Sequence, residues 1–299
     1  MIRISSARIK GALTRAVLIG LAGAVLPLVP AAAAAADPVN VLYAGSLVNL
    51  MERHIGPAFD RASGYRLRGY AGGAQLLANE IRGKLYRADV FVSAAPGVNT
   101  GLMGPHNGNW VSWYITFARS PLVIGYNPAS RFAAAFRSRP WYQVLQSRGI
   151  RLGRTDPKLD PKGALTLELM RRAQAYYRIA HFARRVLGAA ENPAQVLPEE
   201  ELVGRLQSGQ LDAGFFYSTE TSAARIPQIS LPQAITPTAL YTVAIVRDAP
   251  DPQGARAFVA FLLGPMGRRL MKENGLILQR PTVTGGRRPL PARIRMLLK

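Results

Sequence analysis

The stretch from residue 40 to residue 47, Asn-Val-Leu-Tyr-Ala-Gly-Ser-Leu, constrains the fold more than any other part of the sequence. Its apolar first half is typical of a buried strand, and the Gly45-Ser46 pair is typical of a tight turn. From Leu47 the apolar residues recur at three- and four-residue spacing as far as Gly64, which predicts a helix that ends there. Such a turn presents a hydroxyl and several backbone N–H groups at the positive end of a helix dipole, so it is suited to hold an anion. The alternative is an ordinary strand–helix turn in which Ser46 is only an N-cap.

The same strand–turn–helix order occurs again further along the chain. Residues 65–70 alternate like a strand, Gly72-Gly73-Ala74 forms a turn, and residues 75–81 have helical spacing. Residues 87–94 are typical of a third strand, which also ends in small residues. Alternating strands and helices predict an α/β protein with mainly parallel sheets, in which ligands bind at the carboxyl ends of the strands.

Two strongly apolar segments, residues 121–128 and 239–246, are interpreted as strands that cross between two lobes. The sequence therefore predicts a two-lobed α/β protein in which each lobe is a mainly parallel sheet flanked by helices. Residues 37–119 and 240–299 would form lobe 1, and residues 120–239 would be inserted between them as lobe 2.

Further helices and strands are predicted in both lobes. A long helix follows Gly163 and carries an apolar face as far as Leu187. Residues 281–299 are a basic tail, which we expect to lie on the surface or to be poorly ordered. The other predicted elements are a short helix at 199–208, a strand at 211–217, and helices that begin after Asp251 and after Gly264.

Residues 1–36 have the pattern of an export signal: basic residues, an apolar core and a small-residue zone that ends at Ala36. The apolar run is short and is interrupted by Pro27 and Pro30, so a membrane span is rejected. Cleavage near Ala36 would release a chain of 263 residues, which we expect in the periplasm. The sequence has no cysteine, which excludes disulfides and also a lipid attached to an N-terminal cysteine.

The formal net charge of +21, of which the predicted signal carries four, suggests an anionic partner. Lys and Arg are dispersed along the whole chain and no nucleic-acid-binding motif is present, so we expect no nucleic acid as a partner. The three histidines lack metal-ligand spacing, and no nucleophile elbow, Walker loop or dinucleotide fingerprint occurs. We therefore expect no catalytic residue, no metal site and no cofactor. Two other classes stay open: an exported hydrolase, with His54 two turns after Ser46, and a surface protein that binds polyanions by charge.

Turns that donate N–H groups are the chemistry that the sequence offers instead. The turn Asp160-Pro161-Lys162-Gly163 precedes the long helix, so its amides would point outward at a helix N-terminus. Lys162 would add positive charge there, or would be an ordinary solvated lysine. Tyr217 ends a strand, and its hydroxyl would donate to a ligand or belong to the core or its rim.

Several of these features occur in an order that resembles the periplasmic molybdate/tungstate-binding proteins of ABC importers. They are the export signal and the segments at residues 41–47, 88–94, 154–161, 214–218 and 258–275. The likeness covers nearly all of the chain after the signal. It implies a two-lobed binding protein that closes on a tetrahedral oxyanion, delivers it to an ABC permease in the inner membrane and catalyses nothing. We expect this protein to be a monomer.

The resemblance also implies which positions contact the ligand. The family's second serine falls at about Ala74, so a neighbouring amide or the side chain of Gln75 would replace that hydroxyl. Pro161 has no N–H, which leaves the next two amides of its turn, and a short-helix contact falls near Glu199 or Glu200. The ligand-binding residues expected are Gly45, Ser46, Gly73, Ala74, Gln75, Asp160, Lys162, Gly163 and Tyr217.

Two departures from the family pattern bear on the ligand. A tungstate-binding branch adds two carboxylates to the metal oxyanion; Asp160 matches the first, but Phe216 stands where the second would be. This weakens the case for six-coordinate binding. The serine missing at Ala74 and the unusual Lys162 leave another small anion open, such as sulfate, phosphate or an organic acid.

Overall fold

The first stretch of the chain folds as a buried strand that turns directly into a helix. The computed structural model describes residues 38–286 and 290–298, so the predicted signal lies outside the described residues. Strand β1 (Pro38–Ala44) leads through the short 3₁₀ helix η1 (Gly45–Leu47) into α1 (Val48–Leu50). The helix continues as a π-helical segment, η2 (Met51–Ile55), and then as α2 (Gly56–Ser63). Gly64 ends it in the left-handed conformation at φ +74°, as its position in the sequence predicts.

The π-helical segment has a local cause in the sequence. Pro57 has no N–H to donate to the carbonyl four residues earlier, so the regular hydrogen-bond ladder cannot continue through it. The amide of Gly56 donates instead to the carbonyl of Met51, five residues back, which is the π-helical pattern.

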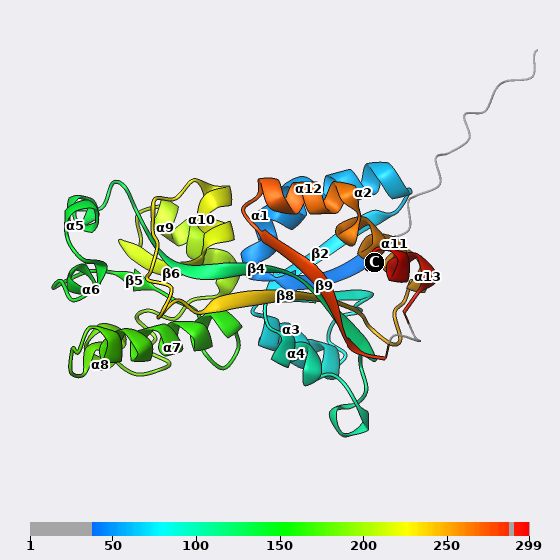
Figure 1. Ribbon diagram of the computed structural model, residues 1–299, viewed down its shortest axis with the longest axis horizontal. Coiled ribbons are helices and arrows are strands. Elements are labelled where there is room, and N and C mark those ends of the chain that lie inside the picture. Colours follow the sequence, from blue (N-terminus) through cyan, green and yellow to red (C-terminus); the bar gives the residue numbers. More distant parts are fainter. Residues whose placement is uncertain (1–37, 287–289, 299) are drawn as a thin grey trace, which may run out of the picture. The chain divides into compact units, whose positions relative to one another are not determined.

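The next elements repeat the strand–turn–helix order. They are β2 (Arg66–Gly72), α3 (Ala74–Arg82), β3 (Val90–Ser93), α4 (Pro96–Thr100) and η3 (Pro105–Asn107). β1 pairs in parallel with β2 on one side and with β3 on the other, so the turns after the three strands lie at one edge of the sheet. Figure 1 shows these strands with α2 on one side and α3 and α4 on the other.

Two long strands run side by side through the middle of the sheet (Figure 1): β4 (Trp113–Tyr126) and β8 (Thr238–Ile245). They pair antiparallel, and Ser120 lies opposite Ala239. β8 also pairs with β3, whereas β4 also pairs with β6 (Ala213–Tyr217). These two strands therefore connect the sheet of β1–β3 with the sheet of β5 and β6, as the crossing-strand interpretation predicts. The lobe boundaries at residues 119/120 and 239/240 stay a prediction.

The segment between the two long strands is built mainly of short helices around β6. Its elements are α5 (Ala133–Ser138), α6 (Trp141–Val144), β5 (Leu152–Gly153), α7 (Pro161–Tyr176), α8 (Phe182–Leu187), η4 (Glu199–Glu201), α9 (Leu202–Gln207), α10 (Ser218–Ala224) and β7 (Gln228–Ile229). α7 packs on β4, β6 and β8, while α9 and α10 pack on β6. The single long helix predicted as far as Leu187 is wrong: Arg178 and His181 adopt left-handed conformations and separate α7 from α8.

The carboxyl-terminal part returns to the first three strands. α11 (Pro252–Leu263) and α12 (Pro265–Glu273) begin at the predicted Asp251 and Gly264 positions, and α11 packs on β1 and β8. Of the two alternatives for the basic tail, poor order is wrong for its described part, which contains regular elements. β9 (Ile277–Gly285) pairs antiparallel with β4, and α13 (Ala292–Met296) packs on α11.

The sheet is more mixed than the sequence pattern predicts. Its order is β2-β1-β3-β8-β4-β6-β5, with β7 and β9 pairing to β4 off this path. The pairs β1–β2, β1–β3 and β5–β6 are parallel, and every pair that β4 or β8 makes is antiparallel. The architecture is α/β, and the ends of β1, β2, β3 and β6 gather short turns at one region of the molecule.

Candidate functional site

Residues from both ends of the sheet meet around the turn after β1. The side chain of Ser46 accepts a hydrogen bond from the hydroxyl of Tyr241 in β8 at 3.1 Å. The neighbouring Gly45 lies against Glu199 of η4, because a Cβ added at Gly45 would be 3.0 Å from the Glu199 Cβ. η1 also packs on α10, which follows Tyr217 at the end of β6. The turn that the sequence singles out is therefore covered by η4 and α10.

Lys162 lies in the first turn of α7 and is completely buried. Its ammonium group is 2.8 Å from Glu220 Oε1 and 3.3 Å from Glu199 Oε1. The same group lies 5.4 Å from the ring centroid of Tyr217, within the range of a cation–π interaction. Of the two interpretations of Lys162 from sequence, the solvated surface lysine is wrong.

Asp160 caps the start of α7. Its Oδ1 accepts the backbone N–H of Lys162 at 2.9 Å, and its carbonyl accepts the N–H of Gly163 at 3.1 Å. The sequence predicts that these two amides bind a ligand, and in this structure both donate to Asp160. Gly163 is required at its position for another reason, because a Cβ there would lie 2.5 Å from the carbonyl oxygen of Thr155.

Several buried oxygen atoms at this place have no hydrogen-bond partner within the described part of the chain. They are Oδ2 of Asp160, Oε2 of Glu199, the hydroxyl of Tyr217 and the hydroxyl of Thr155, while Oε1 of Glu199 has only its ion pair with Lys162. Buried polar groups are nearly always paired, so such a concentration marks a place where a polar ligand or water completes the hydrogen bonding.

The electrostatics of the site follow from three carboxyl groups around one ammonium group. Burial raises the pKa of Asp160 well above its ordinary value, and the charge of Glu199 adds to this shift. Burial also raises the pKa of Glu220, although Lys162 opposes it. Burial lowers the pKa of Lys162, but the carboxylates of Glu220, Glu199 and Asp160 outweigh it, so that the pKa is raised. The lysine is therefore charged, while burial disfavours the charged forms of Asp160 and Glu220.

The second glycine turn contacts the Asp160 turn directly. A Cβ added at Gly73 would lie 2.6 Å from the carbonyl oxygen of Leu159, and that oxygen accepts the backbone N–H of Leu76 at 3.0 Å. Ala74 is buried in the first turn of α3, whose leading amides have no partner within the helix. The side chain of Gln75 donates to Asn79 at 3.0 Å along the helix surface.

Two cavities adjoin these residues. One of about 550 Å³ is lined by Gly45, Ser46, Glu199 and Glu220, together with polar residues of η2 and α9. Another of about 430 Å³ is lined by Gln75, Asp160, Pro161 and Leu240, between α4 and the start of α7. Of the predicted site residues, Gly45 and Ser46 line the first cavity, and Gln75 and Asp160 line the second.

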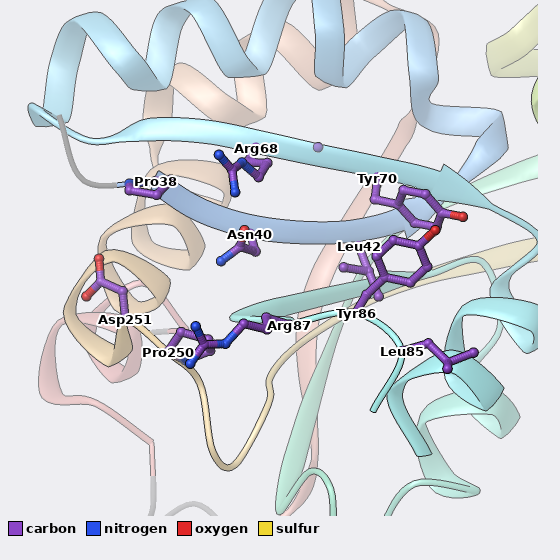
Figure 2. A pocket seen from close by; sticks show the side chains of 11 residues that line it. Pro38, Asn40, Leu42, Arg68, Tyr70, Leu85, Tyr86, Arg87, Pro250 and Asp251 are labelled. Atoms are coloured by element: carbon purple, nitrogen blue, oxygen red, sulfur yellow. The ribbon is translucent and has the colours of Figure 1, made fainter. Parts of the chain in front are cut away.

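A larger groove of about 790 Å³ lies elsewhere, on the open face of β1 and β2. Figure 2 shows that Arg68, Arg87 and the facing rings of Tyr70 and Tyr86 line it. The two rings stack at a centroid distance of 4.0 Å, and Tyr86 is 42% exposed. None of the nine residues predicted to bind a ligand lines this groove, so we place the candidate site at the Ser46 turn.

Sequence reasoning finds most of this site but misses three of its members. Glu220 and Tyr241 carry no local signal, because each is an ordinary residue of its helix or strand until the fold brings it to Lys162 or Ser46. Glu199 is noticed only as a short-helix position. Phe216 packs in a small apolar cluster with Leu202 and Leu206, and the carboxylates that pair with Lys162 come from η4 and α10.

Comparison with known proteins decides the family. The family model described as bacterial extracellular solute-binding protein matches residues 39–277, which is most of the chain. This protein belongs to that family. A solute-binding protein of Petrotoga mobilis, named as uncharacterized, is 32% identical over 221 residues, which cover 63% of this chain and 67% of the relative. The molybdate/tungstate-binding protein WtpA of Thermococcus kodakarensis is 24% identical over 266 residues, which cover 73% of this chain and 74% of the relative.

Solved structures show that this solute-binding protein has the fold of its class. The periplasmic molybdate-binding protein of Azotobacter vinelandii matches with a TM-score of 0.63 at 18% identity, covering 81% of this chain and 99% of the other. The sulfate-binding protein SubI of Mycobacterium tuberculosis matches with a TM-score of 0.61 at 16% identity, covering 87% and 90%. The two-lobed α/β fold expected from the sequence is confirmed.

Of the helices in residues 38–286 and 290–298, none combines the length and the apolar character that crossing a membrane requires. The same residues hold no group of three or more His, Cys, Asp or Glu side chains arranged to bind a metal ion.

Proposed function

We propose that this solute-binding protein is exported, captures a tetrahedral oxyanion between its two lobes and delivers it to an ABC permease. Molybdate and tungstate are the ligands that we propose first. The observation that carries the proposal is the meeting of Ser46, Lys162 and the buried hydroxyl of Tyr217 at the place where turns from both ends of the sheet pack together.

The chemistry of this site suits a small anion that must lose its water. Burying an ion without replacing its hydration is prohibitively costly, so donors from the protein must surround it. Hydrogen bonds to a charged group contribute roughly 1.5–3 kcal/mol each. Ser46 and Tyr217 supply hydroxyl donors, the starts of η1 and α3 supply amides, and Lys162 supplies a full positive charge. A handful of such donors is enough for roughly micromolar binding after the cost of closure.

The relatives support this choice of ligand. WtpA of Thermococcus kodakarensis is named for molybdate and tungstate, and the structural neighbour from Azotobacter vinelandii is named for molybdate. Solute-binding proteins of this family serve transport, and we propose that this member likewise acts without catalysis, as a periplasmic monomer. Its lobes would hinge where β4 and β8 cross, near the paired residues Ser120 and Ala239.

A binding panel tests the proposal. The protein lacking residues 1–36 is titrated with molybdate, tungstate, sulfate and phosphate while its thermal midpoint is recorded. A ligand at a hundred times its Kd should stabilise the fold by about 2.7 kcal/mol. If none of the four oxyanions raises the midpoint, the proposed function is wrong.

Ser46→Ala supplies the site-directed arm of the same experiment. The variant should bind about tenfold or more weakly, because it removes a hydroxyl at the ligand. Ser138→Ala is the matched control, since the hydroxyl of Ser138 only bonds its own exposed helix at the carbonyl of Ala134. Equal affinities of the two variants would remove Ser46 from the site.

A further inference from the structure

The candidate site holds more negative than positive charge, which is unusual for a site that is to receive an anion. Asp160, Glu199 and Glu220 surround the single ammonium group of Lys162, and all four side chains are almost fully buried. With every group ionised, the site would carry a net charge of −2. A dianion that entered this site unchanged would meet strong repulsion, because little solvent is present to screen it.

The hydrogen-bonding inventory shows the same imbalance. The ammonium group of Lys162 forms ion pairs with Glu220 and Glu199, and the hydroxyl of Tyr241 already donates its hydrogen bond to Ser46. The oxygens left over on Asp160 and Glu199 are acceptors, as are the oxygens of an oxyanion. Two acceptors that face each other need a proton between them.

We propose that this site takes up protons together with its oxyanion, and that the carboxyl groups of Asp160 and Glu199 receive them and donate hydrogen bonds to the bound anion. The protons come from the solvent, and each carboxyl oxygen that gains one changes from an acceptor into a donor. This inference rests on the proposed function and specifies its ligand class as the oxyanions of weak acids. Oxyanions of weak acids, such as molybdate and tungstate, accept such hydrogen bonds well. Sulfate, the conjugate base of a stronger acid, accepts them poorly and is disfavoured.

The surroundings of Asp160 support proton uptake at that residue. Burial and Glu199 favour the neutral form of Asp160 and prevail over Lys162 and the hydroxyl of Thr155, which favour the charged form, so the pKa of Asp160 is raised. On η4, Glu200 lies beside Glu199, and its own pKa is raised by burial. On β6, β8 and α10 stand Tyr217, Tyr241 and Glu220, of which only Glu220 brings charge, and that charge is negative.

Asp160 and Glu199 are suited to this role by their positions. As the cap of α7, Asp160 accepts the backbone N–H of Lys162 at Oδ1, so Oδ2 is the oxygen that can take up a proton. Glu199 is held against Gly45, so its carboxyl group adjoins the turn that carries Ser46. Glu220 is less suited, because Lys162 and the backbone N–H of Tyr217 occupy its two oxygens.

Calorimetry measures this proton uptake directly. Molybdate is titrated into the protein lacking residues 1–36 between pH 6.5 and 8.5, in buffers of different ionisation enthalpy. Molybdate in solution stays a dianion over this range, so any proton taken up is taken up by the complex. We expect about one proton or more per bound ion near neutral pH, and an affinity that falls about tenfold per pH unit for each proton taken up. Sulfate should bind at least tenfold more weakly than molybdate.

Variants in which a carboxyl group is replaced by an uncharged amide identify the residues that take up the protons. Asp160→Asn keeps the helix cap, and Glu199→Gln keeps the shape of the side chain; each should reduce proton uptake and flatten the pH dependence. Asp251→Asn is the matched control for the first, since Asp251 caps α11 in the same Asp-Pro context. Glu201→Gln is the control for the second, since Glu201 is an exposed neighbour that pairs with Arg205.

The outcomes separate this inference from the proposed function. Tight molybdate binding without proton uptake, or sulfate binding as tight as molybdate binding, overturns the inference and leaves the function standing. If no oxyanion gives a binding heat at any pH, the proposed function is wrong, and the inference is wrong with it. Because the wild-type protein alone decides between these outcomes, a variant that fails to fold does not weaken the test.

Discussion

The ammonium group of Lys162 lies 2.8 Å from Oε1 of Glu220, and both side chains are almost fully buried. These residues are 58 positions apart in the chain, one at the start of α7 and the other in α10. The pair therefore joins the two helices that flank β6. Its Glu220 lines the same cavity as Ser46. It positions the charge of the site and also stabilises the fold around it.

Replacing Lys162 by methionine should destabilise the protein strongly. The change leaves the carboxylates of Glu220 and Glu199 buried without their counterion, and breaking a buried pair in this way costs roughly 3–5 kcal/mol. Urea unfolding followed by circular dichroism measures this loss.

The control for this change is Lys158→Met, three residues before α7 begins at Pro161. Lys158 pairs with Glu191, but its side chain is 73% exposed, so we expect no measurable loss of stability. Adding Glu220→Gln to Lys162→Met should restore part of the stability, because it removes one of the stranded charges. A Lys162→Met variant as stable as Lys158→Met would contradict this account of the buried pair.

Tyr217→Phe should weaken ligand binding without harming the fold. The hydroxyl of Tyr217 is buried, and no group in residues 38–286 or 290–298 hydrogen-bonds to it, so its removal costs the ligand-free protein nothing and slightly stabilises it. Loss of a charge-assisted hydrogen bond to the ligand should reduce the affinity for molybdate about ten- to a hundredfold. Calorimetry and thermal unfolding, measured on the same samples, check both halves of the prediction.

Tyr241→Phe is an informative comparison for that variant. Its hydroxyl donates to Ser46 at 3.1 Å, so its loss should lower stability as well as affinity. If Tyr217→Phe instead lowered stability and left the affinity unchanged, the hydroxyl would belong to the fold and not to the ligand site.

Much of this architecture follows from local sequence signals. Asp160 and Asp251 cap helices because a short acidic side chain followed by proline suits the start of a helix, whatever surrounds it. Gly64 ends its helix because the left-handed conformation is readily open to glycine. Ser46 is found for the same kind of reason, since strand, turn and helix lie next to each other in the chain.

The features that the sequence does not predict depend on contacts between distant parts of the chain, or on backbone conformations that the residue types do not indicate. Glu220 and Lys162 meet only after β6 and α7 have packed, and β9 is ordered by its pairing with β4, from which it is more than 150 residues away. The break between α7 and α8 occurs at Arg178 and His181, two residue types that give no warning of a left-handed conformation.

Gly73→Ala should weaken binding through the contact between the two turns. A Cβ at Gly73 would lie 2.6 Å from the carbonyl oxygen of Leu159, so the start of α3 and the Asp160 turn could not approach as closely as they do here. The backbone at Gly73 has φ −57°, which alanine adopts easily, so the variant should fold normally. We expect a loss of affinity for molybdate of tenfold or more, measured by calorimetry. Gly97→Ala, where an added Cβ has nothing within 4 Å, should bind like the wild type.

The stability of the ligand-free protein should depend on pH through Asp160 in an unusual direction. Burial and Glu199 raise the pKa of this carboxyl group in the folded state above its unfolded value of about 4. Between these two values the folded protein holds a proton that the unfolded chain releases, so the contribution of Asp160 to stability falls as the pH rises. Relative to Asp160→Asn, the wild type should therefore lose free energy of unfolding as the pH rises above about 4, measured by urea unfolding at a series of pH values.

Asp212 provides the opposite case within the same chain. Burial raises the pKa of Asp212, but the hydrogen bonds from Arg151 and Ser130 outweigh it and hold the pKa below its ordinary value. Its contribution to stability is therefore present above about pH 4 and is lost as the pH falls through the lowered pKa. The difference between wild type and Asp212→Asn should grow as the pH rises through this range, while the difference between wild type and Asp160→Asn declines. Two curves of the same slope would show that Asp160 is ionised in the ligand-free folded protein, and would contradict the raised pKa of this carboxyl group.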